Sequence, residues 1–131
     1  MSGRVTGFGG RILKQDKQAA KYMNSPESEV YQKSKMLYGL YQAKQHIAKE
    51  SNCYLVEGYT DVIQMHQAGI QNVVSSSGTA LTPDQVRLIR RLTNTITLLF
   101  DGDAAGIRAA IRGVDIILEA GMHVFICTFP A

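Results

Sequence analysis

From Cys53 onward, short apolar runs alternate with segments of helical character, and this alternation restricts the fold more than any other feature. The apolar runs are "CYLVEG", "NVVSSS", "TITLLF" and "HVFICTF". Between them lie "TDVIQMHQAG", "TPDQVRLIRRL" and "AAGIRAAIRGVDIILEAG", with short connections. Strands that take turns with helices predict an α/β fold with a parallel sheet, because each parallel connection needs a crossover. Few polar residues interrupt the runs, as expected for strands buried on both faces.

Local signals predict where the helices begin, end and face the core. Thr82 is the expected N-cap of the middle helix, Pro83 its first residue, and Gly69 closes the preceding helix. In the last helix the spacing of the large apolar residues predicts a stripe that faces the core. This stripe consists of Ile107, Ile111, Val114 and Leu118.

The two cysteines, Cys53 and Cys127, each lie in an apolar run. We therefore expect both thiols to be buried and reduced, as is usual in the cytoplasm. The chain has no CxxC pair, which argues against a structural zinc site. No apolar run approaches the ~20 residues that span a bilayer, and the first residues lack the apolar core of a signal peptide. The expected location is the cytoplasm, with no membrane partner.

The first fifty residues have a different character. They hold nine Lys and Arg against four Asp and Glu, whereas residues 51–131 hold five against seven. The stretch "RVTGFGGRIL" predicts a strand pair with a glycine turn, and "MLYGLYQAKQHIAKES" predicts a helix. The apolar stripe of that helix is Met36, Leu40, Ala43 and Ile47. We expect a small basic α+β lobe at 1–51 and an α/β domain at 52–131. The basic half suggests a polyanionic partner, although a solvated surface with accidental asymmetry is the alternative.

Carboxylates gather where the apolar runs end. Asp101 and Asp103 follow "TLLF", Glu57 ends "YLVE", and Asp61 lies in the first turn of the next helix. Side chains two apart on an extended segment point the same way, so Asp101 and Asp103 repel each other unless a cation or water separates them. The carboxyl ends of parallel strands share one edge, where ligands bind. The pattern predicts a magnesium site, because Mg²⁺ prefers a few carboxylates with waters and phosphates.

Other interpretations compete for some of these residues. Asp61 can simply favour a helix N-terminus, and Asp103 can be a helix N-cap. A calcium loop of the EF-hand type also begins D-x-D, but it requires an oxygen ligand and an acid where this chain has Ala105 and Arg112. The histidines are too scattered to form a metal triad: they are His46, His66 and His123.

Six stretches of the chain resemble, in order and spacing, the catalytic core of bacterial replicative DNA primases. They are "GRVTGFGGRIL", "KYMNSPES", "KMLYGLYQA", "VEGYTDVI", "SSSGTALT" and "FDGDAAG". The fourth and sixth resemble the two acidic motifs of the TOPRIM domain, which primases share with type IA and type II topoisomerases and some nucleases. The resemblance covers nearly the whole chain. It implies a Rossmann-like TOPRIM sheet of four parallel strands with flanking helices, preceded by the basic lobe.

The resemblance also implies roles for single residues. Glu57, Asp101 and Asp103 fall on the catalytic acids and, with Asp61, on the metal-binding positions for Mg²⁺, with Mn²⁺ as a substitute. Six further residues fall on positions that face nucleotide or template. These are Arg11, Lys21, Asn24, Lys33, Gly78 and Thr79.

The implied activity is metal-dependent nucleotidyl transfer that makes short RNA primers from NTPs on single-stranded DNA. Primases carry a zinc-binding domain before this core, a further acidic motif after its fourth strand, and a helicase-binding domain. None of these is present in the sequence, so we expect a fragment with little activity of its own. Zinc and the helicase would belong to the absent domains. The alternatives are a TOPRIM nuclease or topoisomerase fragment, or a non-catalytic module that binds nucleic acid.

Overall fold

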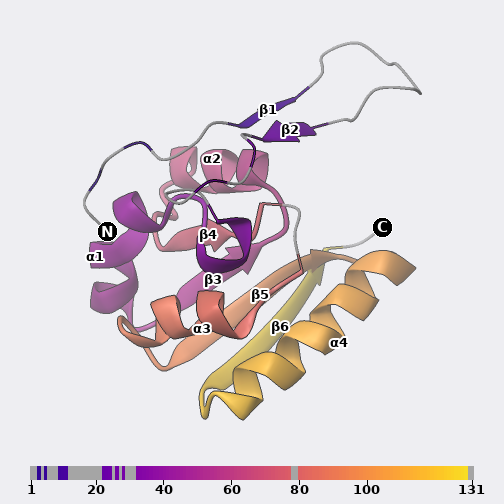
Figure 1. Cartoon of the computed structure of the whole chain (residues 1–131). Coiled ribbons are helices and arrows are strands. Elements are labelled where there is room, and N and C mark those ends of the chain that lie inside the picture. Colours follow the sequence, from indigo (N-terminus) through magenta and orange to yellow (C-terminus); the bar gives the residue numbers. More distant parts are fainter. Residues whose placement is uncertain are drawn as a thin grey trace. The chain divides into compact units, whose positions relative to one another are not determined.

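The computed structural model describes residues 32–77 and 80–129, together with residues 3, 5, 9–11, 22–24, 26 and 28. The chain divides into two compact units, residues 1–32 and 33–131 (Figure 1). The second unit includes helix α1 (Leu40–Glu50), which we expected in the basic lobe. Helix α1 belongs with the sheet because Leu40, Ala43 and Ile47 are buried in the same core as the strands.

The first unit contains two short strands. Strand β1 (Gly9–Arg11) pairs antiparallel with β2 (Tyr22–Asn24), with Gly9 opposite Asn24. The sequence predicted a strand pair within "RVTGFGGRIL". The strand Gly9–Arg11 instead pairs with Tyr22–Asn24, which lies in "KYMN" beyond the glycine-rich stretch.

The second unit is built on a parallel sheet, which confirms the predicted α/β class. Its strands are β3 (Cys53–Val56), β4 (Val73–Ser75), β5 (Thr95–Asp101) and β6 (His123–Phe129), in the order β4-β3-β5-β6. All three pairings are parallel, with Leu55 of β3 opposite Val74 on one side and Leu98 on the other. The β-branched and apolar composition of these runs suits strands that are covered on both faces.

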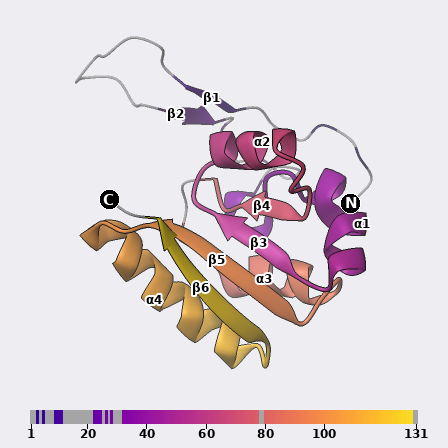
Figure 2. The ribbon, with the colours of Figure 1, turned by 180° about the vertical axis from the view of Figure 1, so that it is seen from behind.

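Helices cover the two faces of the sheet unequally. Helices α1, α3 (Pro83–Arg90) and α4 (Ala104–Glu119) pack on the face that carries Leu55, Ile96 and Leu98. Helix α2 (Tyr59–Gln67) packs on the opposite face, against Val56 and Leu99. Helix α3 accordingly lies in front of the sheet in Figure 1 and behind it in Figure 2. None of the helices in the described ranges is long and apolar enough to cross a membrane.

The predicted helix ends are confirmed. Thr82 is the N-cap of α3, its hydroxyl accepting the backbone N–H of Gln85, and Pro83 is the first helical residue. Gly69, just past α2, adopts a left-handed backbone with φ +92°, which is favourable for glycine.

The predicted core face of α4 is wrong. Ile107, Ile111 and Leu118 are exposed and Val114 is only half-buried. The neighbouring stripe is buried instead: Gly106, Ala110, Gly113 and Ile117. The reason is the closeness of α4 to β5, because a Cβ added at Gly113 would already touch Leu98 Cδ1 at 3.4 Å. A helix that lies so near the sheet turns its small residues inward.

The expectation for the cysteines holds for one of the two. Cys53 in β3 is fully buried, and burial raises the pKa of its thiol. Cys127 in β6 is exposed, contrary to the prediction. Both lie in apolar runs, but β3 has strands on both sides, whereas β6 ends the sheet.

Candidate functional site

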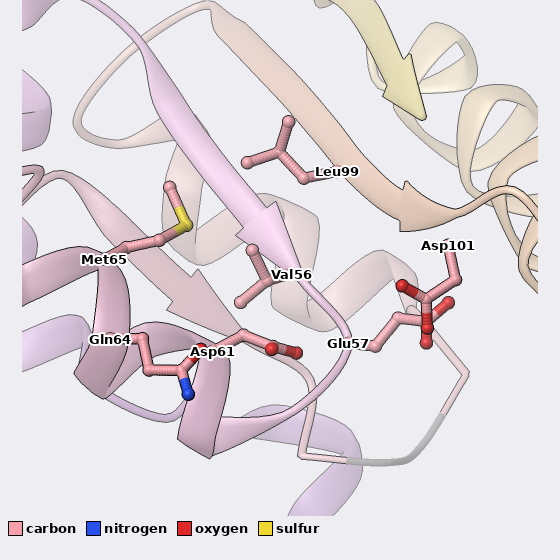
Figure 3. A pocket seen from close by; sticks show the side chains of 7 residues that line it. All are labelled: Val56, Glu57, Asp61, Gln64, Met65, Leu99 and Asp101. Carbon is pink, nitrogen blue, oxygen red and sulfur yellow. The ribbon is translucent and has the colours of Figure 1, made fainter. Parts of the chain in front are cut away.

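The carboxyl edge of the sheet contains a topological switch between β3 and β5. From β3 the chain passes to β4 on one side, and from β5 it passes to β6 on the other. Connections that leave adjacent parallel strands in opposite directions leave a crevice at the carboxyl ends, where ligands bind in open α/β sheets. Glu57 follows β3 directly and Asp101 is the last residue of β5, so both carboxylates lie at this crevice (Figure 3).

A pocket of about 220 Å³ opens beside these two carboxylates. Apolar side chains and polar side chains line it together: Val56, Met65 and Leu99, with Glu57, Asp61, Gln64 and Asp101. Figure 3 shows that α2 contributes Asp61, Gln64 and Met65 from one side. Residues three and four apart lie on one helix face, so the position of Asp61 in the sequence was a signal for Gln64 and Met65, which we did not predict as site residues.

Asp103 lies just after β5 and caps the next helix. Its Oδ1 accepts the backbone N–H of Gly106 at 2.7 Å, which makes Asp103 the N-cap of α4. The interpretation of Asp103 as a helix cap is therefore correct. A carboxylate has two oxygens and several acceptor positions, so the cap leaves acceptor capacity for a ligand.

Gly106 holds the two aspartates close to the start of α4. A Cβ at this position would lie 2.2 Å from the carbonyl oxygen of Asp101 and 3.1 Å from Oδ1 of Asp103. Any side chain would have to push the helix away from the strand end. Glycine at position 106 thus lets the end of β5 and the first turn of α4 form one tight corner that carries both carboxylates.

The four acids interact electrostatically. The pKa of Glu57 lies above its ordinary value, first because the carboxyl is partly buried and then because Asp101, Asp103 and Asp61 repel its charge. Each of these causes disfavours the ionised form of Glu57. A cation placed among the four carboxylates would remove the repulsion, so the electrostatics of the site favour a positively charged ligand.

The donor set fits a hydrated magnesium ion better than an enclosed metal. Among the residues that the structure describes, no group of three or more His, Cys, Asp or Glu side chains could by itself hold a metal ion. Mg²⁺ usually keeps several waters and is bound through one or two carboxylates together with substrate phosphates. Glu57, Asp101 and Asp103 are suited to such a site.

The basic and polar residues singled out in the sequence are placed only in part. Lys33 begins the short 3₁₀ helix η1 (Lys33–Lys35) in the second unit. Arg11 and Asn24 lie in β1 and β2 of the first unit, where only the backbone is described. Lys21, Gly78 and Thr79 lie outside the described residues.

Comparisons with known proteins identify the family of this chain. Residues 54–131 match the family described as Toprim-like, and residues 1–44 match the N-terminal domain of the DNA primase catalytic core. The DNA primase of Halalkalibacterium halodurans is 48% identical over 128 residues, covering 98% of this chain and 21% of that protein. The DNA primase of Aquifex aeolicus is 44% identical over 128 residues, covering 98% of this chain and 26% of that protein.

Solved structures give the same result for the fold. The zinc-binding and RNA polymerase domains of the Aquifex aeolicus primase match with a TM-score of 0.91 at 44% identity, over 98% of this chain and 32% of that one. The E. coli primase catalytic core matches with a TM-score of 0.86 at 42% identity, over 98% and 41%. The DnaG primase catalytic domain bound to ssDNA matches with a TM-score of 0.85 at 41% identity, over 98% and 42%.

The chain spans about a fifth to a quarter of the length of these curated relatives. Within that span the fold and the sequence agree with one group of proteins. This chain belongs to the Toprim-like family and corresponds to a segment of the catalytic core of bacterial DNA primases.

Proposed function

We propose that this chain is the metal-binding part of a primase core, which makes short RNA primers on single-stranded DNA by nucleotidyl transfer. The observation that carries the proposal is the convergence of Glu57, Asp61 and Asp101 on one pocket. Partial burial, and then repulsion by Asp101, Asp103 and Asp61, raises the pKa of Glu57 there. Carboxylates that gather at one crevice would repel nucleic acid and triphosphates. They are useful in a polymerase only with divalent cations between them and the phosphates.

The proposed metal ligands are the strand-end acids. Asp101 and Asp103 would hold Mg²⁺, or Mn²⁺ in its place, and Glu57 would hold or orient a second ion. Bound ions of this kind polarise the phosphoryl group and stabilise the attacking and leaving oxygens. Asp61 is exposed in the first turn of α2 and lines the same pocket, so it would act through water or through its charge.

Glu57 has a second proposed role. Because its pKa is raised, its carboxylate takes up a proton more readily than an ordinary glutamate does. That property suits a group that accepts the proton of an attacking 3′-hydroxyl.

The proposed contacts to polyanions come from basic and small residues. Arg11, Lys21 and Lys33 would bind phosphates of template or nucleotide, and Asn24, Gly78 and Thr79 would supply polar or backbone contacts. The excess of positive charge in the first fifty residues supports this assignment. So does the similarity to a catalytic domain that was solved with ssDNA.

The rest of the proposal concerns the longer protein. NTPs, the RNA primer and a replicative helicase would be its partners in the cytoplasm, with zinc held by a separate domain. The functional division would be 1–51 and 52–131, and the two family matches, which meet between residues 44 and 54, support it. The chain by itself would make primers slowly, because orientation of both substrates supplies much of such a rate.

A titration with paramagnetic Mn²⁺, followed by NMR, tests the metal site. The amide signals of Gly58 and Gly102 should broaden first, because these residues adjoin Glu57 and Asp101. Excess Mg²⁺ should restore the signals by competition. The Asp101→Asn variant should need more Mn²⁺ for the same broadening. Broadening centred on His66 or Glu119 would contradict the proposed site.

A further inference from the structure

The side chain of Gln85, in the first turn of α3, is completely buried and makes three hydrogen bonds. Its Oε1 accepts the backbone N–H of Thr82 at 3.1 Å. Its Nε2 donates to the carbonyl oxygen of Lys33 at 2.9 Å and to that of Met36 at 2.8 Å. The two amide hydrogens therefore bind a segment that lies about fifty residues earlier in the chain.

Thr82 adds a further hydrogen bond to the same segment. Its hydroxyl accepts the backbone N–H of Gln85 as the N-cap and donates to the carbonyl oxygen of Ser34. Three carbonyl groups of residues 33–36 are thus bound by the first turn of α3. We call Thr82 and Gln85 the α3 clamp.

The α3 clamp goes beyond what a helix cap requires. In a capping box the residue at N3 only has to accept a hydrogen bond from the N-cap backbone, and glutamate does this as well as glutamine. Only glutamine also carries two hydrogens that can donate. The side-chain amide of Gln85 therefore binds the segment 33–36 in addition to capping the helix.

The clamped segment lies at the edge of the sheet that carries the acids. Tyr38, just after the segment, forms a backbone bridge with Ser75, the last residue of β4: each N–H donates to the other carbonyl, at 2.8 and 3.2 Å. Helix α3 starts after β4 and so begins at the carboxyl edge as well. The backbone of Lys33 and Lys35 is thereby held near the carboxyl edge of the sheet, on the side that α3 covers.

We propose that Thr82 and Gln85 are positioning residues, which fix Lys33 so that it meets the phosphodiester backbone of single-stranded DNA beside the carboxylates. The inference rests on the proposed function. Hydrogen bonds from Thr82 and Gln85 to the carbonyl groups of Lys33, Ser34 and Met36 leave the backbone of this segment little freedom. A lysine on such a backbone loses less entropy when it binds a phosphate than one on a mobile loop.

The test is a double-mutant cycle on the 131-residue chain with a labelled oligonucleotide, read by fluorescence anisotropy over a series of salt concentrations. Lys33→Ala should reduce the slope of log affinity against log salt by about 0.7, the value for one phosphate contact on a single strand. Gln85→Met should reduce it by a similar amount. Lys33→Ala should then have no further effect in the Gln85→Met background.

Two control variants separate positioning from general stability. Thr82→Ser keeps the hydroxyl and should bind DNA as the wild type does. Ile89→Val removes one buried methyl group from α3 without touching the clamp. It should lower the melting temperature but leave the salt slope unchanged, when all variants are measured well below their melting temperatures.

The outcomes distinguish this inference from the proposed function. If the wild type does not bind single-stranded DNA, the proposed function fails and the inference fails with it. If the wild type binds and Gln85→Met keeps the full salt slope, or the effects of Gln85→Met and Lys33→Ala simply add, the inference alone is overturned. A reduced slope in Ile89→Val would also overturn it, because loss of stability would then explain the effect.

Discussion

The two edges of the parallel sheet are closed to very different degrees. All three residues of β4 are buried, and Tyr38 pairs with its outer side through Ser75. At the other edge Phe125 and Ile126 of β6 are 62% and 50% exposed, and in the described part of the chain no further strand pairs with β6. An apolar sequence is therefore enough to form a strand, but its burial depends on what the neighbouring elements supply.

Helix α4, like β6, carries exposed apolar side chains. Ile107, Ile111 and Leu118 are exposed along its length. We call these three residues, with Phe125 and Ile126 of β6, the open flank. The acids lie between the two sides: Glu57 follows β3, which has strands on both sides, whereas Asp101 ends β5 and Asp103 caps α4, one of the two elements of the open flank.

The largest expected difference between the two sides is in thiol reactivity. Cys53 in the central strand is buried and the pKa of its thiol is raised, whereas Cys127 in β6 is exposed. Iodoacetamide at pH 8 should alkylate Cys127 readily and Cys53 only when the unit unfolds, so the two rates should differ by several orders of magnitude. Mass spectrometry of tryptic peptides over time gives both rates.

A matched control uses the same reagent in denaturant, where both cysteines should react at similar rates. Equal rates under native conditions would show that β3 opens easily, and the contrast between the two sides would be wrong.

The next largest effect concerns two isoleucines of α4, of which one faces the core and the other belongs to the open flank. Ile117 is fully buried and Ile111 is 57% exposed. Ile117→Ala should lower the free energy of unfolding by about 2–5 kcal/mol, through lost burial and a cavity. Ile111→Ala should change it by no more than about 0.5 kcal/mol, as is usual at the surface. Urea unfolding followed by circular dichroism measures both. A loss of more than about 2 kcal/mol in Ile111→Ala would mean that the open flank is covered in solution.

These contrasts show what the sequence allowed us to predict. The strands and helices followed from the alternating runs, and Glu57 and Asp101 followed from the rule that ligands gather at carboxyl ends. The core face of α4 did not, because two adjacent stripes of a helix have the same period, and the stripe with Gly106 and Gly113 became the inner one through close contact with β5. The pattern from Thr82 to Gln85 predicts a capping box, but its link to residues 33–36 depends on tertiary structure.

The local sequence pattern also could not predict that β6 is exposed. The run "HVFICTF" is as apolar as "CYLVEG", and the period of both indicates a strand. Only the strand order places one in the centre and the other at the edge. The cost of an exposed apolar side chain is set by its neighbours in space, which a single sequence does not specify.

The smallest expected effect lies at the acids themselves and is a dependence of stability on pH. The pKa of Glu57 is higher in the folded chain than in the unfolded chain, so between these two values the folded chain binds more protons. The free energy of unfolding therefore falls as the pH rises through this window. Glu57→Gln should remove that fall and be more stable than the wild type at neutral pH in EDTA. The gain should be a fraction of a kcal/mol, because solvent screens a partly exposed carboxylate.

Magnesium should reverse the order of the two proteins. An ion among the carboxylates stabilises the ionised form of Glu57, so Mg²⁺ should raise the melting temperature of the wild type more than that of Glu57→Gln. Thermal unfolding between pH 4 and 8, with EDTA or with Mg²⁺, measures both effects, and Asp115→Asn on the exposed side of α4 serves as the control. A wild type whose stability rises through the window in EDTA would contradict the raised pKa. Equal responses of Glu57→Gln and the wild type to Mg²⁺ would instead place the ion away from Glu57, and the crevice between β3 and β5 would not be the metal site.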